Sequence, residues 1–296
     1  MGQDETWFLS RKLQQNNTKN EVIFLQKPTF SEVPLIYDSP HSGRNYPADF
    51  GSALPMEMLR RGEDAYVDEL ISNASAQGVT TLVALFPRSY LDVNRRLDDL
   101  DPEMVVDWPE LQLGVKSRLG IGLIRKIIIP GQLIYDRKLT KNEILCRQSK
   151  YYEPYWNYLR GEISRLVQRW GRVWWVNWHS MKSMGNEATP DGAKPRADVV
   201  ISDLDGNSSS LEFRQLVEEF FLEKGLSVSV NDPYKGGTLL KELARPSANI
   251  HGLQIELNRA LYLDEAKVCK TNNFTALQQI IEQMTQKFCG YLEATK

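Results

Sequence analysis

The feature that most constrains the fold is a pair of apolar, strand-like runs, each of which ends in a histidine. The run RVWWVNWHSM, residues 172–181, is the strongest strand candidate in the chain and carries His179 into a Ser/Gly/Asn loop. The run LIYDSPHSG, residues 35–43, ends in a small-residue turn that presents His41. Only three histidines occur in 296 residues. Because ligands bind outside the carboxyl ends of strands in open α/β sheets, we expect these two histidines to converge there.

Strand-like and helix-like patterns alternate along most of the chain, which predicts a sheet with helices packed on its faces. Apolar residues at three- and four-residue spacings predict an amphipathic helix over residues 63–77, and a strand begins at Val79. Residues 86–99 have the pattern of a short strand leading into a charged loop, and residues 127–129 that of another short strand. Further strands are expected within residues 21–26, 197–204, 226–230 and 250–262, and further helices within 139–171 (with a possible break at Glu153-Pro154), 211–225, 239–246 and 277–296.

Size and charge describe an ordinary globular chain. At 296 residues we expect a single α/β domain, residues 1–296, with a polar N-terminal lead-in over residues 1–33. A net charge of −2 gives no bias toward nucleic acid or anionic membranes. No apolar run is long enough to cross a bilayer, and the start lacks the pattern of a secretory signal, which favours a cytoplasmic protein. The three cysteines are widely spaced, so we expect packing roles for them only.

The two histidines, with a carboxylate pair between them in sequence, have the chemistry of a metal site. A catalytic zinc ion takes three protein ligands, usually His or carboxylate, and leaves one position open for water. Glu63 and Asp64 open the predicted helix that follows the first histidine loop, so either can be the third ligand beside His41 and His179. Each histidine can instead be a hydrogen-bonded loop or core residue, and carboxylates are favoured at a helix start without any metal. The residue types alone leave both interpretations open.

Other polar residues near the strand ends are candidates for acid–base chemistry and substrate binding. Glu256 lies in the apolar run LQIEL, where a carboxylate is paired, placed at a hydrated site or costly, unless it simply faces solvent. Beside a metal-bound water, such a carboxylate can take a proton and pass it to a leaving amine. Arginine binds carboxylates in bidentate fashion, and Asn94 can add a hydrogen bond to the same anion; the arginines near strand ends are Arg88, Arg95 and Arg259.

A series of ordered segments between about residues 34 and 265 resembles the N-formylglutamate amidohydrolases, or N-formylglutamate deformylases. These segments are PHSGRNYP, EDAYVDEL, FPRSYLDVNR, GLIRK, PGQLIYDRKLT, YYEPYW, WHSMKS, YKGG and HGLQIELNRALYLDE. The resemblance implies a zinc-carboxypeptidase-like (phosphorylase/hydrolase-like) three-layer α/β/α fold with a mixed sheet. It also implies hydrolysis of the N-formyl amide of N-formyl-L-glutamate to formate and L-glutamate, in histidine breakdown, with Zn²⁺ or another divalent metal.

The positions that match this family imply roles for individual residues. His41 and His179 resemble the metal histidines, and Asp64 matches the acidic residue that precedes the VDEL segment, which makes it the preferred third ligand over Glu63. Glu256 corresponds to the general base of the wider group of related deacylases and carboxypeptidases. The DVNR segment resembles a substrate-holding DLNR segment of the same group, which implies substrate binding by its Asn and Arg, residues 94 and 95.

One departure from the family pattern bears on the substrate. The family continues its paired glycines as in GGYITRHYG, whereas Gly236 and Gly237 are followed here by TLLKELARP, so that Lys241 replaces the expected Arg and Glu242 the expected His. A lysine can hold a carboxylate, but not with a planar fork. The alternatives are therefore a hydrolase of another N-acyl amino acid or of a peptidoglycan-like amide, and a non-catalytic carboxylate-binding relative. The long irregular stretch 98–131 is predicted to be a substrate loop or lid.

Overall fold

A computed structural model describes residues 17–28, 31–186, 189 and 191–294 of the chain. Most of the predicted lead-in, residues 1–16, lies outside this described part. The centre of the molecule is an eight-stranded sheet in the order β1-β2-β4-β3-β7-β10-β8-β9. Its strands, in that order, are Asn17–Lys19, Ile23–Gln26, Thr80–Ala84, Leu35–Ser39, Val173–Met181, Ile250–Asn258, Val199–Ser202 and Val228–Val230.

The sheet is mixed, as predicted. Strands β4, β3, β7 and β10 run parallel to one another in the middle of the sheet. Strand β2 is antiparallel to β4 on one side, and β8 is antiparallel to β10 on the other. Two small two-stranded sheets pair β5 (Val105–Val106) with β6 (Leu139–Thr140), and β11 (Leu263–Asp264) with β12 (Cys269–Lys270). The carboxyl ends of the four central strands therefore share one edge, the place where α/β folds bind their ligands.

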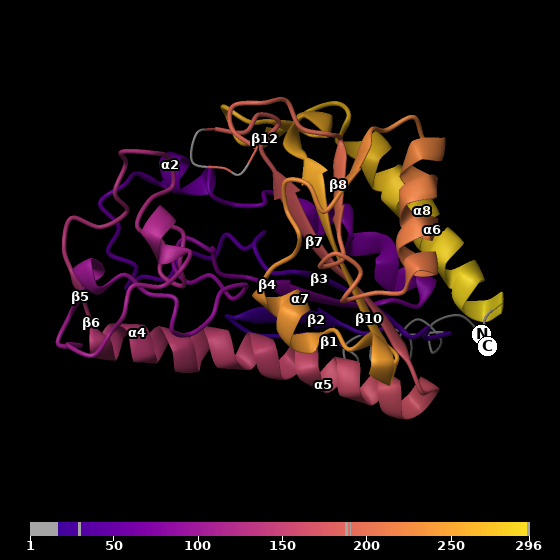
Figure 1. The fold of residues 1–296 in the computed structure, drawn as a ribbon, viewed down its shortest axis with the longest axis horizontal. Coiled ribbons are helices and arrows are strands. Elements are labelled where there is room, and N and C mark those ends of the chain that lie inside the picture. The colour runs from indigo at the N-terminus through magenta and orange to yellow at the C-terminus, as the bar shows by residue number, and fades with distance from the viewer. Residues whose placement is uncertain (1–16, 29–30, 187–188, 190, 295–296) are drawn as a thin grey trace, which may run out of the picture.

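Helices cover both faces of the sheet and make three layers (Figure 1). One hydrophobic core packs α5 (Glu153–Trp170) and α7 (Thr238–Leu243) against one face, and a second core packs α3 (Val67–Leu70), α6 (Leu211–Glu223) and α8 (Phe274–Ala294) against the other. Helices α2 (Met56–Arg60) and α4 (Lys141–Arg147) belong to the irregular part of the molecule at the end away from α6 and α8 (Figure 1). The prediction of an α/β fold with a mixed sheet is confirmed.

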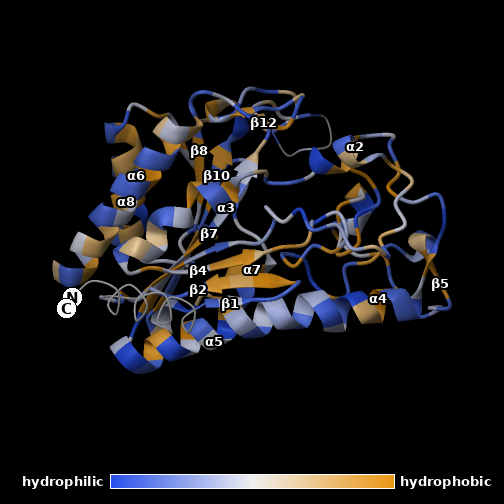
Figure 2. Ribbon diagram, turned by 180° about the vertical axis from the view of Figure 1, so that it is seen from behind, coloured by the Kyte–Doolittle hydropathy of each residue, from blue (hydrophilic) through white to orange (hydrophobic). Residues whose placement is uncertain are grey.

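The two faces of β7 and β10 differ in chemistry. Along β10, Leu253, Ile255 and Leu257 belong to the core shared with α6 and α8, while the residues between them are polar. Strand β7 alternates in the same way, with Trp178 in that core. Successive side chains of a strand point to opposite faces, so the polar set of both strands projects toward the α5 and α7 side. Figure 2 shows the strands as largely hydrophobic ribbons, with helices that are polar on part of their surface.

Three of the predicted elements differ in the structure. The helix expected over residues 63–77 is reduced to α3 and a 3-10 helix at Ser72–Gln77, because Tyr66 before α3 has a left-handed backbone (φ 64°). Residues 86–99 and 127–129 form turns and loops rather than strands. Their backbone groups bond to other loop residues, which a local pattern does not reveal: Asp92 N donates to Leu123 O (2.9 Å).

The expected break at Glu153-Pro154 takes a mild form. Helices α4 and α5 are joined by a π-helical turn at Gln148–Tyr152, and Pro154 lies in the first turn of α5. Proline is tolerated there because the first N–H groups of a helix have no partner within the helix. The result is one nearly continuous helical rod beneath the sheet (Figure 1). None of the helices in the described ranges is long and apolar enough to span a membrane.

Candidate metal centre

Three segments far apart in sequence bring His41, Asp64 and His179 together at the carboxyl edge of the central strands. His41 follows the end of β3, His179 lies near the end of β7, and Asp64 precedes α3. The backbone N–H of Asp64 donates to the carbonyl oxygen of His41 (3.0 Å), which fixes the two ligand-bearing turns to each other. Gly43 is required beside them, because a Cβ there would lie 2.4 Å from the carbonyl carbon of Leu85. All three side chains of the cluster are buried.

The facing atoms of this cluster are close. His179 Nδ1 lies 2.9 Å from Asp64 Oδ2, His41 Nδ1 lies 3.3 Å from the same oxygen, and the two Nδ1 atoms are 3.0 Å apart. Of the His, Cys, Asp and Glu side chains in the described ranges, only these three form a group that could hold a metal ion. The set of two imidazole nitrogens and one carboxylate oxygen is typical of catalytic zinc sites.

The outward nitrogens determine which tautomer each histidine adopts. His41 Nε2 lies 2.7 Å from Asp92 Oδ1, a carboxylate that can only accept when ionised. His179 Nε2 lies 2.7 Å from Asn177 Oδ1, and Asn177 presents that oxygen because its Nδ2 donates to both carboxylate oxygens of Asp38 (2.9 Å each). Both histidines therefore carry the proton on Nε2 and a lone pair on Nδ1.

Three electron-pair-bearing atoms thus face one another across about 3 Å with no hydrogen between them. Such an arrangement is repulsive when empty and is satisfied by a cation. The outward partners match the usual second shell of a metal site, in which each ligating histidine donates its other N–H to a carboxylate or carbonyl oxygen. The residues therefore fit a divalent metal held by His41 Nδ1, His179 Nδ1 and Asp64 Oδ2.

Charge around the cluster keeps its carboxylates ionised. Burial alone would raise the pKa of Asp64, but the charge of Arg88 opposes it, and that pKa is held well below its usual range. Arg259 Nη2 also donates to Asp64 Oδ1 (3.1 Å). Burial would likewise raise the pKa of Asp92, but the charges of Arg88 and Arg95 and the hydrogen bond from His41 hold that pKa well below its usual range. Both carboxylates are therefore available at neutral pH, one facing the metal position and one facing His41.

Glu256 stands next to this cluster. It is the register partner of His179 in the parallel pair β7–β10, so the two side chains project from the same face. Its side chain is buried, with 8% of the residue exposed, and Gln254 Nε2 donates to its Oε1 (2.9 Å). Burial raises the pKa of Glu256, and the charge of Asp64 adds to that rise. A raised carboxyl pKa suits a group that must both take and return a proton near neutral pH.

Asn94 connects the cluster to the paired-glycine loop. Its Nδ2 lies 3.4 Å from His179 Nε2, a longer contact than the one from Asn177, and its Oδ1 accepts from the backbone N–H of Leu239 in α7 (2.9 Å). A Cβ at Gly237 would lie 2.2 Å from Asn94 Nδ2, so only glycine allows this close approach. Arg95 turns toward backbone, with its Nε donating to Ile121 O (2.9 Å).

Two of the predicted site residues point elsewhere. Glu63 accepts from the Tyr46 hydroxyl (2.6 Å) and pairs with Arg60 (3.5 Å), so its carboxylate is directed away from the histidines. Lys241 is exposed on α7, and its backbone N–H donates to Gly237 O. Its side chain makes no hydrogen bond or ion pair with the cluster in the described ranges.

Four residues around the cluster were missed by sequence reasoning: Asp38, Asp92, Arg125 and Asn177. Arg125 lies beside the cluster because its Nε is 3.8 Å from Asp92 Oδ2. Asp92 lies in DVNR and Arg125 in GLIRK, two of the segments that resemble the family. The acidic residue of DVNR was the one sequence feature that could have indicated a partner for a ligating histidine. Asp38 and Asn177 lie inside apolar strands, where a buried polar residue in alternation can be noticed but its partner cannot be predicted.

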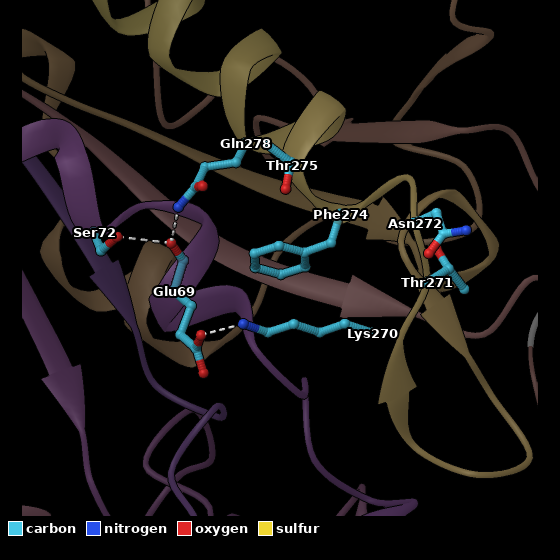
Figure 3. A pocket seen from close by; sticks show the side chains of 8 residues that line it. All are labelled: Glu69, Ser72, Lys270, Thr271, Asn272, Phe274, Thr275 and Gln278. Carbon is cyan, nitrogen blue, oxygen red and sulfur yellow. Dashed lines mark hydrogen bonds and ion pairs between the residues drawn. The ribbon is translucent and has the colours of Figure 1, made fainter.

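A separate hollow between α3, β12 and α8 is shown in Figure 3. Glu69 pairs there with Lys270, and its backbone oxygen accepts from Ser72 Oγ and Gln278 Nε2 (2.8 Å each). The Lys270 ammonium nitrogen lies 4.1 Å from the centroid of the Phe274 ring. The lining of this hollow includes none of the three clustered ligands.

Comparison with known proteins agrees with the class of protein that this fold and site define, a hydrolase built on a mixed α/β sheet. A family model described as N-formylglutamate amidohydrolase matches residues 33–263. The chain belongs to the N-formylglutamate amidohydrolase family, as the sequence motifs predicted. It is 24% identical over 250 residues to an N-formylglutamate deformylase of Pseudomonas aeruginosa, covering 83% of this chain and 87% of that one.

Solved structures agree. The crystal structure of an N-formylglutamate amidohydrolase from Ralstonia eutropha superposes with a TM-score of 0.87 at 39% identity, covering 94% of this chain and 100% of that one. A gene product of Agrobacterium tumefaciens has a TM-score of 0.65 at 18% identity, with 93% of this chain and 97% of that one covered, a likeness of fold alone.

Proposed function

We propose that the protein hydrolyses the N-formyl amide of N-formyl-L-glutamate to formate and L-glutamate, as a step of histidine breakdown in the cytoplasm. The single observation that carries this proposal is the convergence of His41 Nδ1, His179 Nδ1 and Asp64 Oδ2 as three acceptor atoms, in a chain of the amidohydrolase family. A hydrolase of this family needs an activated water and a polarised acyl oxygen, and both are the usual work of a metal bound to such a ligand set.

The metal would be zinc or another divalent ion, held by His41, Asp64 and His179. When bound, it lowers the pKa of a coordinated water and polarises the acyl oxygen of the substrate. Asp92 and Asn177 keep the two imidazoles in the tautomer that offers Nδ1 to it.

The chain's own residues carry the proton transfers. Glu256 takes a proton from the attacking water as the new C–O bond forms at the formyl carbon. It then delivers that proton to the glutamate nitrogen as the C–N bond breaks, so that formate and the amino acid leave. General acid–base catalysis of this kind contributes about 10²–10⁴-fold to a rate. Glu256 is the register partner of His179 in the β7–β10 pair, which supports its assignment as the general acid–base residue. Arg88, Arg259 and Asn94 surround the same edge and are proposed, together with Arg95, to orient the substrate.

A formate-release assay tests this proposal. Purified protein should release formate from N-formyl-L-glutamate, lose that activity after treatment with a chelator, and regain it on addition of zinc. Metal analysis of protein purified without chelator should find about one metal ion per chain. Protein without stoichiometric metal, and without activity after zinc addition, would instead be a carboxylate-binding relative that does not catalyse.

A second candidate is the hydrolysis of another N-acyl amino acid or a peptidoglycan-like amide. It is favoured by the exposed Lys241 and Glu242, which stand where the family has Arg and His. A substrate panel separates the two. Formylglutamate turned over no better than acetyl and other acyl amino acids would reject the deformylase proposal in favour of this candidate.

A further inference from the structure

Four arginines approach the proposed site, and one of them differs from the rest. Arg88 and Arg259 donate to Asp64, and Arg95 donates to backbone carbonyls. Arg125 makes no hydrogen bond through its guanidinium to any group in the described ranges, and its Nε is buried without a partner. Only 11% of its side chain is exposed. A guanidinium has five N–H donors, so this one is left with almost all of its bonding capacity unused.

The nearest carboxylate is already saturated. Asp92 Oδ2 lies 3.8 Å from Arg125 Nε, beyond hydrogen-bonding distance. That oxygen accepts from Arg88 Nη2 (2.9 Å) and Arg88 Nε (3.2 Å). The other oxygen of Asp92 accepts from His41 Nε2 (2.7 Å) and from the backbone N–H of Asn94 (3.0 Å). Asp92 therefore attracts the Arg125 charge electrostatically, but its oxygens already accept other hydrogen bonds and accept none from Arg125.

The backbone that carries Arg125 is firmly held. On one side, Leu123 O accepts from Asp92 N (2.9 Å) and Ile121 O accepts from Arg95 Nε (2.9 Å). On the other side, Lys126 O accepts from Ile134 N (2.8 Å). The guanidinium is thus presented from an anchored loop, and a ligand that binds it would not have to order the chain first.

Arg125 keeps its charge at working pH. Burial, with the nearby charge of Arg88, lowers the pKa of Arg125 to about 9, which leaves the guanidinium protonated at neutral pH. Burying an unpaired charge is costly, and proteins usually supply a partner. Since the described residues supply no hydrogen-bonded partner, the partner is expected to be a ligand that carries a planar anion.

We propose that Arg125 is a specificity-determining, substrate-binding residue that holds one carboxylate of the substrate. This inference rests on the proposed function for the identity of the substrate, but the anion site itself does not depend on hydrolysis. The planar fork of arginine matches a carboxylate with two parallel N–H···O bonds. Arg125, rather than the exposed Lys241, then supplies the planar carboxylate recognition that the Lys241 departure put in doubt.

Kinetics with three substrates test the proposal. We compare wild type, Arg125→Gln and Arg125→Lys on N-formyl-L-glutamate and on its α-amide and γ-amide, each of which lacks one carboxylate. Arg125→Gln should lower kcat/KM for N-formyl-L-glutamate by at least about 30-fold, the range found when one partner of a buried charge pair is removed. The loss should vanish with the one amide that lacks the carboxylate bound by Arg125. The kcat/KM of Arg125→Lys for N-formyl-L-glutamate should lie between those of wild type and Arg125→Gln.

A control variant and a metal readout separate binding from damage to the fold. Arg118→Gln replaces an exposed arginine of the same segment and should leave all three kcat/KM values unchanged. Metal content should be the same in every variant. An equal loss with all three substrates, or no loss with any of them, would overturn the proposal.

Binding of glutarate, a dicarboxylate with no amide to cleave, provides a readout without turnover. Calorimetry should detect glutarate binding to wild type, and Arg125→Gln should weaken it by at least about 30-fold. Glutarate that binds through Arg125 to a protein that does not cleave formylglutamate would reject the proposed function and retain the anion site. Equal affinity in both proteins, or no binding to wild type, would overturn the role of Arg125.

Discussion

Replacing Asp92 by asparagine is the sharpest test of how the metal centre is supported. In the structure this carboxylate accepts four hydrogen bonds: from His41 Nε2 at 2.7 Å, from Asn94 N at 3.0 Å, and from Arg88 at 2.9 and 3.2 Å. Asparagine keeps one accepting oxygen and adds two donors. If the new NH₂ group faces His41, the imidazole must move its proton to Nδ1, which then cannot bind a metal. If it faces Arg88, two donors oppose each other.

Either orientation weakens the metal site. Loss of an outer-shell partner typically lowers metal affinity 10- to 100-fold, about 1.4–2.7 kcal/mol. Because both faces of the carboxylate are occupied here, we expect the upper half of that range. The assay is a competition titration of metal-free protein with zinc and a chromophoric chelator, alongside thermal unfolding of each metal-free protein.

The matched control is Asp98→Asn in the same loop. The Asp98 side chain is 67% exposed, and within the described part of the chain its ion-pair partner is Arg96 alone. This substitution should leave zinc affinity unchanged. A folded Asp92→Asn protein whose zinc affinity lay within threefold of wild type would refute the argument that this carboxylate fixes the tautomer of His41.

Three further predictions use other parts of the molecule. Glu256→Gln should lower kcat about 10²–10⁴-fold while zinc content stays stoichiometric; near-normal activity would remove Glu256 from the mechanism. Removal of metal by a chelator should lower Tm, since zinc at 100 times its Kd adds about 2.7 kcal/mol to the free energy of unfolding; an unchanged Tm would argue against a metal in the folded protein. Burial would raise the pKa of Glu32, but Arg165 and Arg169 outweigh burial and lower it from 4.5. The stabilisation that ionised Glu32 gives the folded protein is therefore complete above pH 4.5 and is lost as the pH falls through the lower folded-state pKa. Acid-unfolding curves of wild type and Glu32→Gln should therefore converge at low pH, and curves that stay parallel would contradict this.

The sheet could be predicted from sequence because its signals are local. Strands such as Val173–Met181 and Ile250–Asn258 are apolar runs bounded by turn residues, and helices such as Leu211–Glu223 have period and caps within their own length. The stretch 63–77 has a helical pattern too, but the turn that holds Asp64 against His41 interrupts it. There a tertiary contact overrides local preference.

The candidate site was predictable in part for the same reason. His41 and His179 stand at strand ends, and a topology rule brings such residues to one edge. Choosing between neighbouring carboxylates needs coordinates: Asp64 faces the histidines, whereas Glu63 faces Tyr46. Asn177 acts through a partner: it can be noticed as a polar residue inside an apolar strand, but its partner cannot be predicted from sequence.

The alternating faces of β7 and β10 have a consequence for how this protein can change over evolutionary time. Substitutions on the core-facing positions can be absorbed by repacking, one side chain at a time. Insertion or deletion of a single residue in β7 before Asn177 is different, because it reverses the face to which each following side chain points. The indole of Trp178 would then face the polar side, and the imidazole of His179 would enter the hydrophobic core that packs against α6 and α8. Strand length should therefore be far less free to vary among relatives than strand composition.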